Sequence, residues 1–238
     1  MAHGVRKTLA LSLVAACTLA AGFVLAKDIP DNWDGLVRVK GKRMDAVYLA
    51  PGTDFRKYTK VMLDPTQVAF RKNWLRDVNN DRPGVSRDVS DEDAQKILDK
   101  AKTGFTEVFT KEFQKAGIEV ASAPGSDVLR LTPGVVDLYI NAPDTMSPGR
   151  SRTYTMEAGE ATLILEARDS VTNTLLGRVL DRRETQGGGT MQMTSSVTNI
   201  ADFEQLFAQW AKIAIKGAKE LKEQSPVPEN LQPGQKLN

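Results

Sequence analysis

The sequence predicts an α+β domain in which a mostly antiparallel or mixed β-sheet carries two long amphipathic helices packed on it. Three stretches lead to this fold class: residues 159–184, 90–116 and 200–221. The first alternates apolar and polar side chains with a period of two, which is typical of a strand with one buried face. The other two repeat apolar residues at steps of three and four, as an amphipathic helix does. Elements of these two kinds bury their apolar faces against each other.

The stretch 159–184 is expected to form a central antiparallel hairpin. Ile164 is the only apolar residue on its more polar face. Residues 169–174 are polar turn formers that interrupt the alternation, and residues 175–183 resume as a second strand. The apolar face of the first strand is expected to consist of Ala161, Leu163, Leu165 and Ala167.

The first helix is expected to begin after Ser90, which with Asp93 forms a capping box, and to end before Gly117. Three phenylalanines share one face of this helix. They indicate core packing against the sheet rather than a ligand-binding box, because helices bury such stripes. The second helix, 200–221, is expected to be capped by Asn199. Gly217 lies on its apolar stripe, which suggests close approach to a neighbouring element.

Shorter extended stretches are expected around this frame, at residues 45–49, 58–70, 118–121 and 128–140. Pro65 restricts the second of these to a sheet edge or a bulge. Residues 141–152 contain little apolar surface and are expected to form a long loop of unassigned role. Residues 225–238 contain three prolines and are expected to be a disordered tail, which leaves residues 27–224 as a single domain.

The N-terminal segment 1–26 has the pattern of an export signal. Arg6 and Lys7 precede an apolar, uncharged run that ends in small residues, which favours cleavage before Lys27. A second interpretation is a lipoprotein signal that ends before Cys17, whose thiol would then be lipidated. A third is an uncleaved anchor, since the run is about as long as the shortest membrane-spanning helix.

Composition excludes several classes of function. His3 and Cys17 are the only histidine and cysteine, so cleavage before Lys27 leaves neither residue type. Histidine-dependent nucleophilic catalysis, a histidine-containing zinc site and a disulfide are then excluded. Residues 1–26 hold two basic and no acidic residues, so the remainder carries 30 of each sign. This balance argues against a nucleic-acid-binding surface.

Two groups of residues are candidates for partner binding. Residues 181–184 (DRRE) alternate in charge, so Arg182 and Glu184 share one face of a strand while Asp181 and Arg183 share the other. Two ion pairs explain this pattern, and a guanidinium that binds an anion or a partner protein is the sharper hypothesis.

The second group is aromatic. Tyr48 and Tyr58 flank the turn at residues 51–54. They would form a recognition surface if exposed, or anchor the turn to the core if buried.

No metal or cofactor site is expected. Residues 77–81 space oxygen side chains as a calcium-binding loop does, but Arg82 replaces the glycine that the loop requires and Asp88 replaces its bidentate glutamate. The glycine run at 187–189 lacks the order and the lysine of a phosphate-binding loop. No residue is assigned a catalytic role.

Several short motifs carry a resemblance to a known family: residues 48–55 (YLAPGTDF), 63–65 (LDP), 168–170 (RDS), 180–183 (LDRR) and 210–211 (WA). The chain resembles a bacterial envelope family of unknown function, DUF3313. Members of that family commonly have a lipoprotein signal, which favours Cys17 as a lipidation site, whereas the apolar stretch after Cys17 departs from that pattern. The resemblance implies no established activity and therefore no catalytic residues.

These observations predict an exported protein of a Gram-negative bacterium, in the periplasm or at the outer membrane, that is not an enzyme and binds an envelope protein partner. The fold class is similar to small envelope lipoproteins that assemble with or regulate other machinery. Nucleic acid is not an expected partner, and membrane contact is expected only through a lipid at Cys17. One alternative is a carbohydrate-active hydrolase that uses two carboxylates. Another is a small-ligand or lipid carrier, which requires an apolar cavity between helices and sheet.

Overall fold

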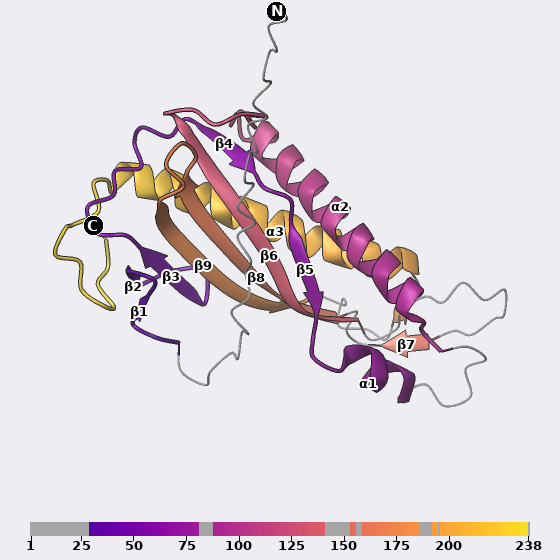
Figure 1. Cartoon of the computed structure of the whole chain (residues 1–238). Helices are drawn as coiled ribbons and strands as arrows, with labels where there is room; N and C mark the ends of the chain where they lie inside the picture. The colour runs from indigo at the N-terminus through magenta and orange to yellow at the C-terminus, as the bar shows by residue number, and fades with distance from the viewer. Residues whose placement is uncertain are drawn as a thin grey trace, which may run out of the picture.

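The computed structural model of the chain describes residues 29–80, 88–140, 153–155, 159–185, 192–194 and 196–237, the backbone alone for 153–155, 192–194 and 196–201 (Figure 1). The expected export segment 1–26 with Cys17, and the expected loop 141–152, therefore lie outside the described residues.

An eight-stranded mixed sheet forms the centre of the fold, as the sequence predicts. Its order is β1-β2-β3-β9-β8-β6-β4, and β5 also pairs with β6. A separate two-stranded sheet pairs β7 (Thr153–Thr155) with β10 (Gln192–Thr194). The strands of the main sheet are β1 (Asn32–Trp33), β2 (Leu36–Val39), β3 (Ala46–Leu49), β4 (Lys60–Leu63), β5 (Gln67–Phe70), β6 (Val128–Ile140), β8 (Gly159–Asp169) and β9 (Leu175–Glu184).

The predicted central hairpin is confirmed by the pairing of β8 with β9. The two strands run antiparallel, with Glu166 opposite Arg178 and Leu165 opposite Val179. Ile164 faces away from the helices, yet it is buried in a small second cluster with Tyr48 of β3. An apolar residue on the polar face therefore marks a place where that face is also covered.

The predicted stretch 58–70 forms two strands instead of one. Both β4 and β5 pair in parallel with β6, at one edge of the main sheet. Pro65 lies between them, where its missing N–H interrupts no ladder, as an edge position allows.

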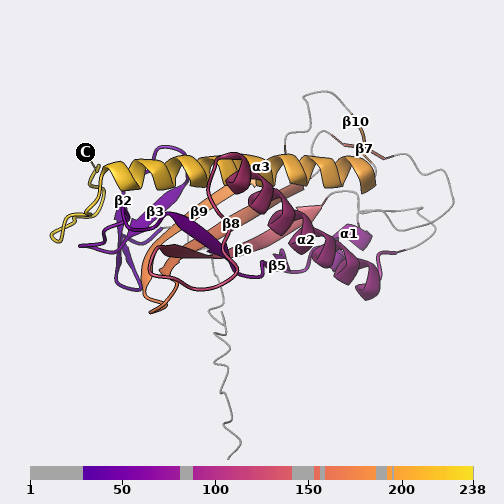
Figure 2. The ribbon, with the colours of Figure 1, turned by 90° about the horizontal axis from the view of Figure 1, so that it is seen from above.

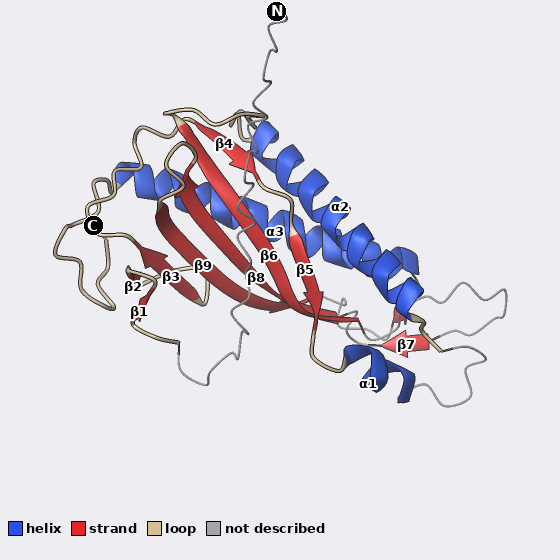
Figure 3. Ribbon diagram, in the orientation of Figure 1, coloured by secondary structure: helices blue, strands red, loops and turns tan. Residues whose placement is uncertain are grey.

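Within the described residues, three helices accompany the sheet, where the sequence predicts two: α1 (Trp74–Asn80), α2 (Asp91–Lys115) and α3 (Ser196–Glu223). Both long helices cover one face of the sheet (Figures 2 and 3). The short helix α1 was not expected from the sequence. Trp74 and Val78 are the buried residues of α1 and lie one turn apart. In a helix of seven residues, such a pair is all the apolar periodicity that the sequence can show.

The start of α2 was predicted correctly from its local sequence, whereas the start of α3 was not. Ser90 caps α2, and its capping box with Asp93 forms as predicted. The helix α3 begins four residues earlier than expected, so Asn199 lies inside its first turn and is not the cap. Gly117 follows α2 with φ +74°, a conformation that glycine adopts without strain.

Aromatic rings of α2 and α3 fill the core between the helices and the sheet. Phe105 contacts Phe207 edge-on, with ring centroids 5.2 Å apart, and Phe207 stacks near Trp210 at 6.1 Å. The three phenylalanines of α2 are at most 1% exposed, so they form core as predicted. They are Phe105, Phe109 and Phe113.

The C-terminal segment is ordered over residues 225–237, which corrects the prediction of a disordered tail. Val227 exchanges backbone hydrogen bonds with Gly52 and Thr53, and Leu231 is also buried. Three apolar side chains, Val227, Leu231 and the partly buried Leu237, are few for a segment of this length, which is why its composition suggested disorder. They are sufficient here because the backbone of the segment pairs with the folded domain.

None of the helices within the described ranges has the length and apolar content needed to cross a membrane.

Candidate functional site

A cavity of about 260 Å³ lies between the C-terminal half of α3 and the sheet. We call it the α3 cavity. Its position follows from the two helices, because α2 packs on the N-terminal half of α3 and the C-terminal half extends beyond it towards β2 and β3 (Figures 1 and 2). Its lining is mainly apolar and includes Val39, Met44, Val47, Leu49, Phe113, Ile118, Leu129, Leu131, Leu165, Val179, Ile213 and Leu221.

Small residues on α3 leave this space open. The buried stripe of the helix changes from large aromatic side chains at its start to Ala214, Gly217 and Ala218 along the cavity. A Cβ atom added to Gly217 would meet no heavy atom within 4 Å. The prediction that Gly217 permits close approach to a neighbour is therefore wrong: the missing side chain leaves a gap.

Basic side chains surround the opening. Five lysines line the cavity and form no ion pair with any described residue. They come from three separate parts of the chain: the β2–β3 connection, the last turns of α3 and the C-terminal segment. They are Lys40, Lys42, Lys219, Lys222 and Lys236, of which all but Lys222 are exposed.

One carboxylate belongs to the same lining. Glu220 of α3 accepts a 3.1 Å hydrogen bond from Arg43 in the β2–β3 connection, so the pair links the two sides of the opening. The hydrogen bond from Arg43 lowers the pKa of the Glu220 carboxyl below its usual value. Two-carboxylate chemistry is not available here, because Glu220 is the only acidic residue that lines this part of the described structure.

Both candidate tyrosines are interior: Tyr58 belongs to the core cluster beside the cavity, whereas the Tyr48 ring lies in the second cluster on the other face of the sheet. The Tyr58 hydroxyl donates a 2.8 Å hydrogen bond to Asp169. Burial is the main cause, and this hydrogen bond the second, that raise the pKa of the Tyr58 hydroxyl to about 12. The Tyr48 hydroxyl donates to the carbonyl of Pro30 at 2.7 Å, and its ring packs edge-on against Trp33. Both rings are at most 3% exposed, which is the arrangement that the anchoring interpretation describes.

The two candidate arginines point to opposite faces of β9. Arg182 is exposed and pairs across strands with Glu160 at 2.6 Å, not with Glu184 as the charge pattern suggested. Arg183 is half-buried on the helix side, where it pairs with Asp181 and donates to the carbonyl of Arg43 at 3.0 Å. The structure thus connects Arg183 to the edge of the α3 cavity, while Arg182 lies on the other face.

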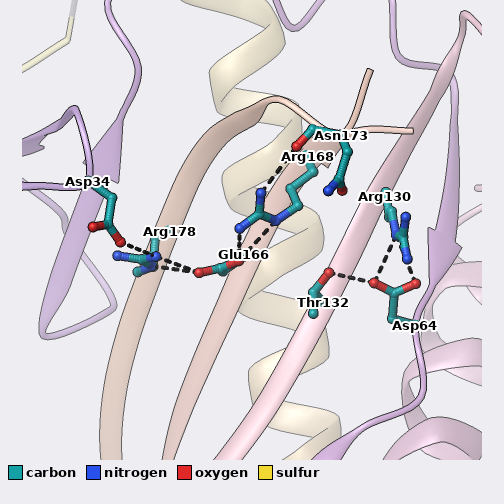
Figure 4. A network of polar contacts seen from close by, with 8 residues as sticks. All are labelled: Asp34, Asp64, Arg130, Thr132, Glu166, Arg168, Asn173 and Arg178. Atoms are coloured by element: carbon teal, nitrogen blue, oxygen red, sulfur yellow. Dashed lines mark hydrogen bonds and ion pairs between the residues drawn. The ribbon is translucent and has the colours of Figure 1, made fainter. Parts of the chain in front are cut away.

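That other face carries a network of charged residues that is balanced internally (Figure 4). Glu166 lies between two arginines, 2.5 Å from Arg178 and 2.6 Å from Arg168. Arg178 also contacts Asp34 at 2.8 Å and lies over the Trp33 ring. Alongside, Asp64 accepts hydrogen bonds from Arg130 and Thr132. Three acids (Asp34, Asp64, Glu166) balance three bases (Arg130, Arg168, Arg178), so this network stabilises the sheet and offers no net charge to a ligand.

A second hollow of about 220 Å³ lies beside the start of α3. Glu184 and Asp202 both line it, and burial raises the pKa of the Asp202 carboxyl. Two carboxylates thus share one hollow here, as a carboxylate-dependent hydrolase requires. No group of three or more residues suited to hold a metal ion occurs among the described residues.

The fold and the cavity define a class: an α+β protein whose helices leave an apolar, lysine-rimmed cavity over a mixed sheet. The chain belongs to the family described as protein of unknown function (DUF3313), whose model matches residues 26–214. No curated protein matches the sequence.

Three solved structures to which this chain is similar share 10–13% sequence identity with it. A dodecameric PelC variant from Paraburkholderia phytofirmans has a TM-score of 0.35, covering 70% of this chain and 96% of its own. A DUF330 protein from Xanthomonas campestris has a TM-score of 0.37, with 73% and 89% covered. A hemagglutinin homolog from Helicobacter pylori has a TM-score of 0.35, with 73% and 91% covered.

Sequence reasoning did not identify the α3 cavity. The change from aromatic to small residues along one helix stripe is a readable signal, and it was assigned to close packing instead. The lysines were not recognised as a set because residues 40, 42, 219, 222 and 236 are distant in the chain. Lys219 and Lys222 also have a local explanation, since positive charge is favourable in the last turns of any helix.

Proposed function

We propose that this protein is a non-enzymatic binding protein of the bacterial cell envelope, which takes up an apolar ligand in the α3 cavity. The single observation that carries this proposal is the open apolar space of about 260 Å³ under α3. A cavity of roughly 150 Å³ is sufficient for benzene, and sites for drug-sized ligands begin at about 300 Å³. The α3 cavity is therefore suited to a small apolar ligand, such as a compact aromatic molecule or one hydrocarbon chain.

The non-enzymatic part of the proposal rests on chemistry. The single histidine and the single cysteine both lie in the segment 1–26, and the cavity contains one carboxylate that is already paired with Arg43. Binding by shape and desolvation requires neither a nucleophile nor a general base.

A neutral fluorescent probe tests the cavity directly. The purified protein is expected to bind N-phenyl-1-naphthylamine saturably, with enhanced fluorescence. Gly217→Leu places a side chain in the cavity and should weaken binding at least about tenfold, since it removes most of the apolar space. Gly104→Leu is the matched control, because Gly104 is also helical with no atom within 4 Å of an added Cβ, but it does not line the cavity. Equal binding by both variants, or none by the parent protein, would contradict the proposal.

The hydrolase alternative has one supporting observation, the hollow that Glu184 and Asp202 share. It predicts turnover of chromogenic glycosides by the parent protein and loss of that turnover in Asp202→Asn. Such a result would replace the binding proposal with an enzymatic one.

The envelope location is part of the proposal and is supported by the N-terminal pattern. Intact-mass measurement of the protein recovered from its host separates cleavage before Lys27, lipidation at Cys17 and an uncleaved Met1. An uncleaved chain recovered from the cytoplasm would contradict export.

A protein partner in the envelope also stays a prediction. The Arg182 side chain is 58% exposed, so the face of the sheet that carries it is the surface on which a partner can be tested. A photo-crosslinker at position 182 is expected to trap one reproducible protein, while one at Lys100, exposed on α2, should trap none. The same products from both positions would argue against a specific partner on this face.

A further inference from the structure

The α3 cavity combines an apolar interior with a basic opening, and the two features together specify a ligand more closely than either alone. Arg43 and the five lysines that form no ion pair with any described residue line the cavity, against one acidic residue, Glu220. The whole chain is close to neutral at +2, so this concentration of positive charge is local. An excess of one sign around an apolar recess favours a ligand that is apolar at one end and oppositely charged at the other.

We propose that the α3 cavity binds a single-chain anionic amphiphile of the fatty acid type, with its hydrocarbon chain in the cavity and its headgroup at the lysines. This inference rests on the proposed function, because it requires the cavity to accept an apolar ligand. The volume allows one chain and not the two of a diacyl lipid, since two chains would need a site well above about 300 Å³.

The helix dipole alone does not explain the lysines. Lys219 and Lys222 lie in the last turns of α3, where positive charge is favourable for any helix. Lys40, Lys42 and Lys236 belong to other parts of the chain, and they line the same opening. Three elements thus contribute ammonium groups to one place, where Glu220, the one carboxylate in the described lining, is paired with Arg43.

The pair of Arg43 and Glu220 extends the argument. It lies across the opening, and each side chain is about one-third exposed, at 31% and 32%. Glu220 is the one group in the lining that would repel an anionic headgroup. Replacing it by glutamine removes that repulsion and frees the Arg43 guanidinium, which suits carboxylate recognition.

Calorimetric titration of the purified protein with dodecanoate and with dodecyltrimethylammonium, both below their micellar concentrations, tests the proposal. Dodecanoate is expected to bind more tightly, and increasingly so at low salt. The triple variant Lys42→Gln, Lys219→Gln, Lys222→Gln should weaken dodecanoate binding by about tenfold, as expected for the loss of three exposed charge contacts. The control triple variant Lys72→Gln, Lys100→Gln, Lys111→Gln changes the net charge equally at exposed positions outside the cavity and should have no effect.

Glu220→Gln gives a result of the opposite sign. It should strengthen dodecanoate binding by about twofold to fivefold, which is the size of one exposed charge interaction. A role for Glu220 in stability alone predicts unchanged or weaker binding.

The outcomes separate this inference from the proposed function. If the neutral probe binds and Gly217→Leu abolishes its binding, but dodecanoate and dodecyltrimethylammonium bind equally, the anionic ligand class is wrong and the cavity remains a binding site. The same conclusion follows if the two triple variants bind dodecanoate alike. If neither the probe nor either amphiphile binds, both proposals are overturned.

Discussion

Trp210 of α3 donates a 2.8 Å hydrogen bond from its indole Nε1 to the carboxylate of Asp181 on β9. Both residues are buried, at 0% and 3% exposure. The same carboxylate accepts a bond from Arg183 and one from the backbone N–H of Asp45 at 3.2 Å. The bond from Trp210 fixes α3 to the sheet directly before the small residues that line the α3 cavity begin.

Trp210→Phe is expected to lower the free energy of unfolding by about 2–4 kcal/mol, because it removes a hydrogen bond to a charged group and leaves unfilled volume. Trp74→Phe is the control: Trp74 is equally buried, but its Nε1 donates to the neutral carbonyl of Ile140 at 3.2 Å. It should cost about 1 kcal/mol less, since bonds to neutral acceptors are weaker. Chemical denaturation measures the free energy of unfolding of both variants. Equal decreases would show that the charge of the Asp181 carboxylate does not strengthen the hydrogen bond from Trp210.

Glu166→Gln should be strongly destabilising, by about 2–4 kcal/mol, because it removes the central carboxylate between two arginines and leaves Arg178 buried without its main counter-charge. Asp31→Asn breaks the exposed pair with Arg38 and should cost less than about 1 kcal/mol. Thermal unfolding of the two variants gives the comparison. Similar midpoints would contradict a structural role for the network on the open face of the sheet.

Gly159→Ala is expected to be among the most damaging small substitutions. The added Cβ would lie 2.1 Å from the backbone oxygen of Tyr139, where β8 meets an irregularity in β6. Relief requires a backbone shift, which costs about 1–3 kcal/mol or more. Gly134→Ala introduces the same methyl group in the neighbouring strand, but its nearest contact is an ordinary 3.7 Å. Denaturation midpoints that fall equally would contradict this steric explanation.

Stability should decrease at acidic pH through Asp169. Backbone N–H groups and the hydroxyl of Tyr58 hold the pKa of the Asp169 carboxyl well below its ordinary value of 3.8. A group with a lowered pKa stabilises the fold above the ordinary pKa, and this contribution is lost as the pH falls below it. Asp169→Asn is therefore expected to be about 1–3 kcal/mol less stable than the parent at pH 7.

The difference between Asp169→Asn and the parent protein should narrow as the pH falls below 3.8, because the parent carboxylate is then progressively protonated on unfolding. Melting temperatures at pH 7, 4 and 2 test this expectation. A gap that stays constant over this range would show that Asp169 does not titrate with unfolding.

Leu231→Ala should lower the free energy of unfolding by about 2–4 kcal/mol, because Leu231 is 5% exposed in the ordered C-terminal segment. The control Val171→Ala changes an apolar residue that is 63% exposed and should cost less than about 0.5 kcal/mol. Hydrogen exchange at Val227, whose N–H is bonded to Thr53, provides a second measurement. An unaffected stability together with rapid exchange would restore the interpretation of this segment as a disordered tail.

Local patterns were sufficient for the elements of the fold. Alternation along residues 159–184 predicted the β8–β9 hairpin, and Ser90 with Asp93 predicted the start of α2, because strand faces and helix caps depend on residues that are neighbours in the chain. The same reasoning failed for the C-terminal segment, where ordering depends on backbone pairing with Gly52 and Thr53, about 175 residues away in the sequence.

The sequence by itself determined the fold class, the hairpin, the two long helices and the scarcity of reactive side chains, since each follows from composition or from short-range periodicity. Only the tertiary structure decided that Tyr48 and Tyr58 are interior, that Arg182 pairs with Glu160, and that Gly217 borders a space instead of a neighbour. The physical reason is that a cavity and its charged opening are properties of distances between elements. No short sequence pattern predicts the space that remains between the helices and the sheet after they have packed.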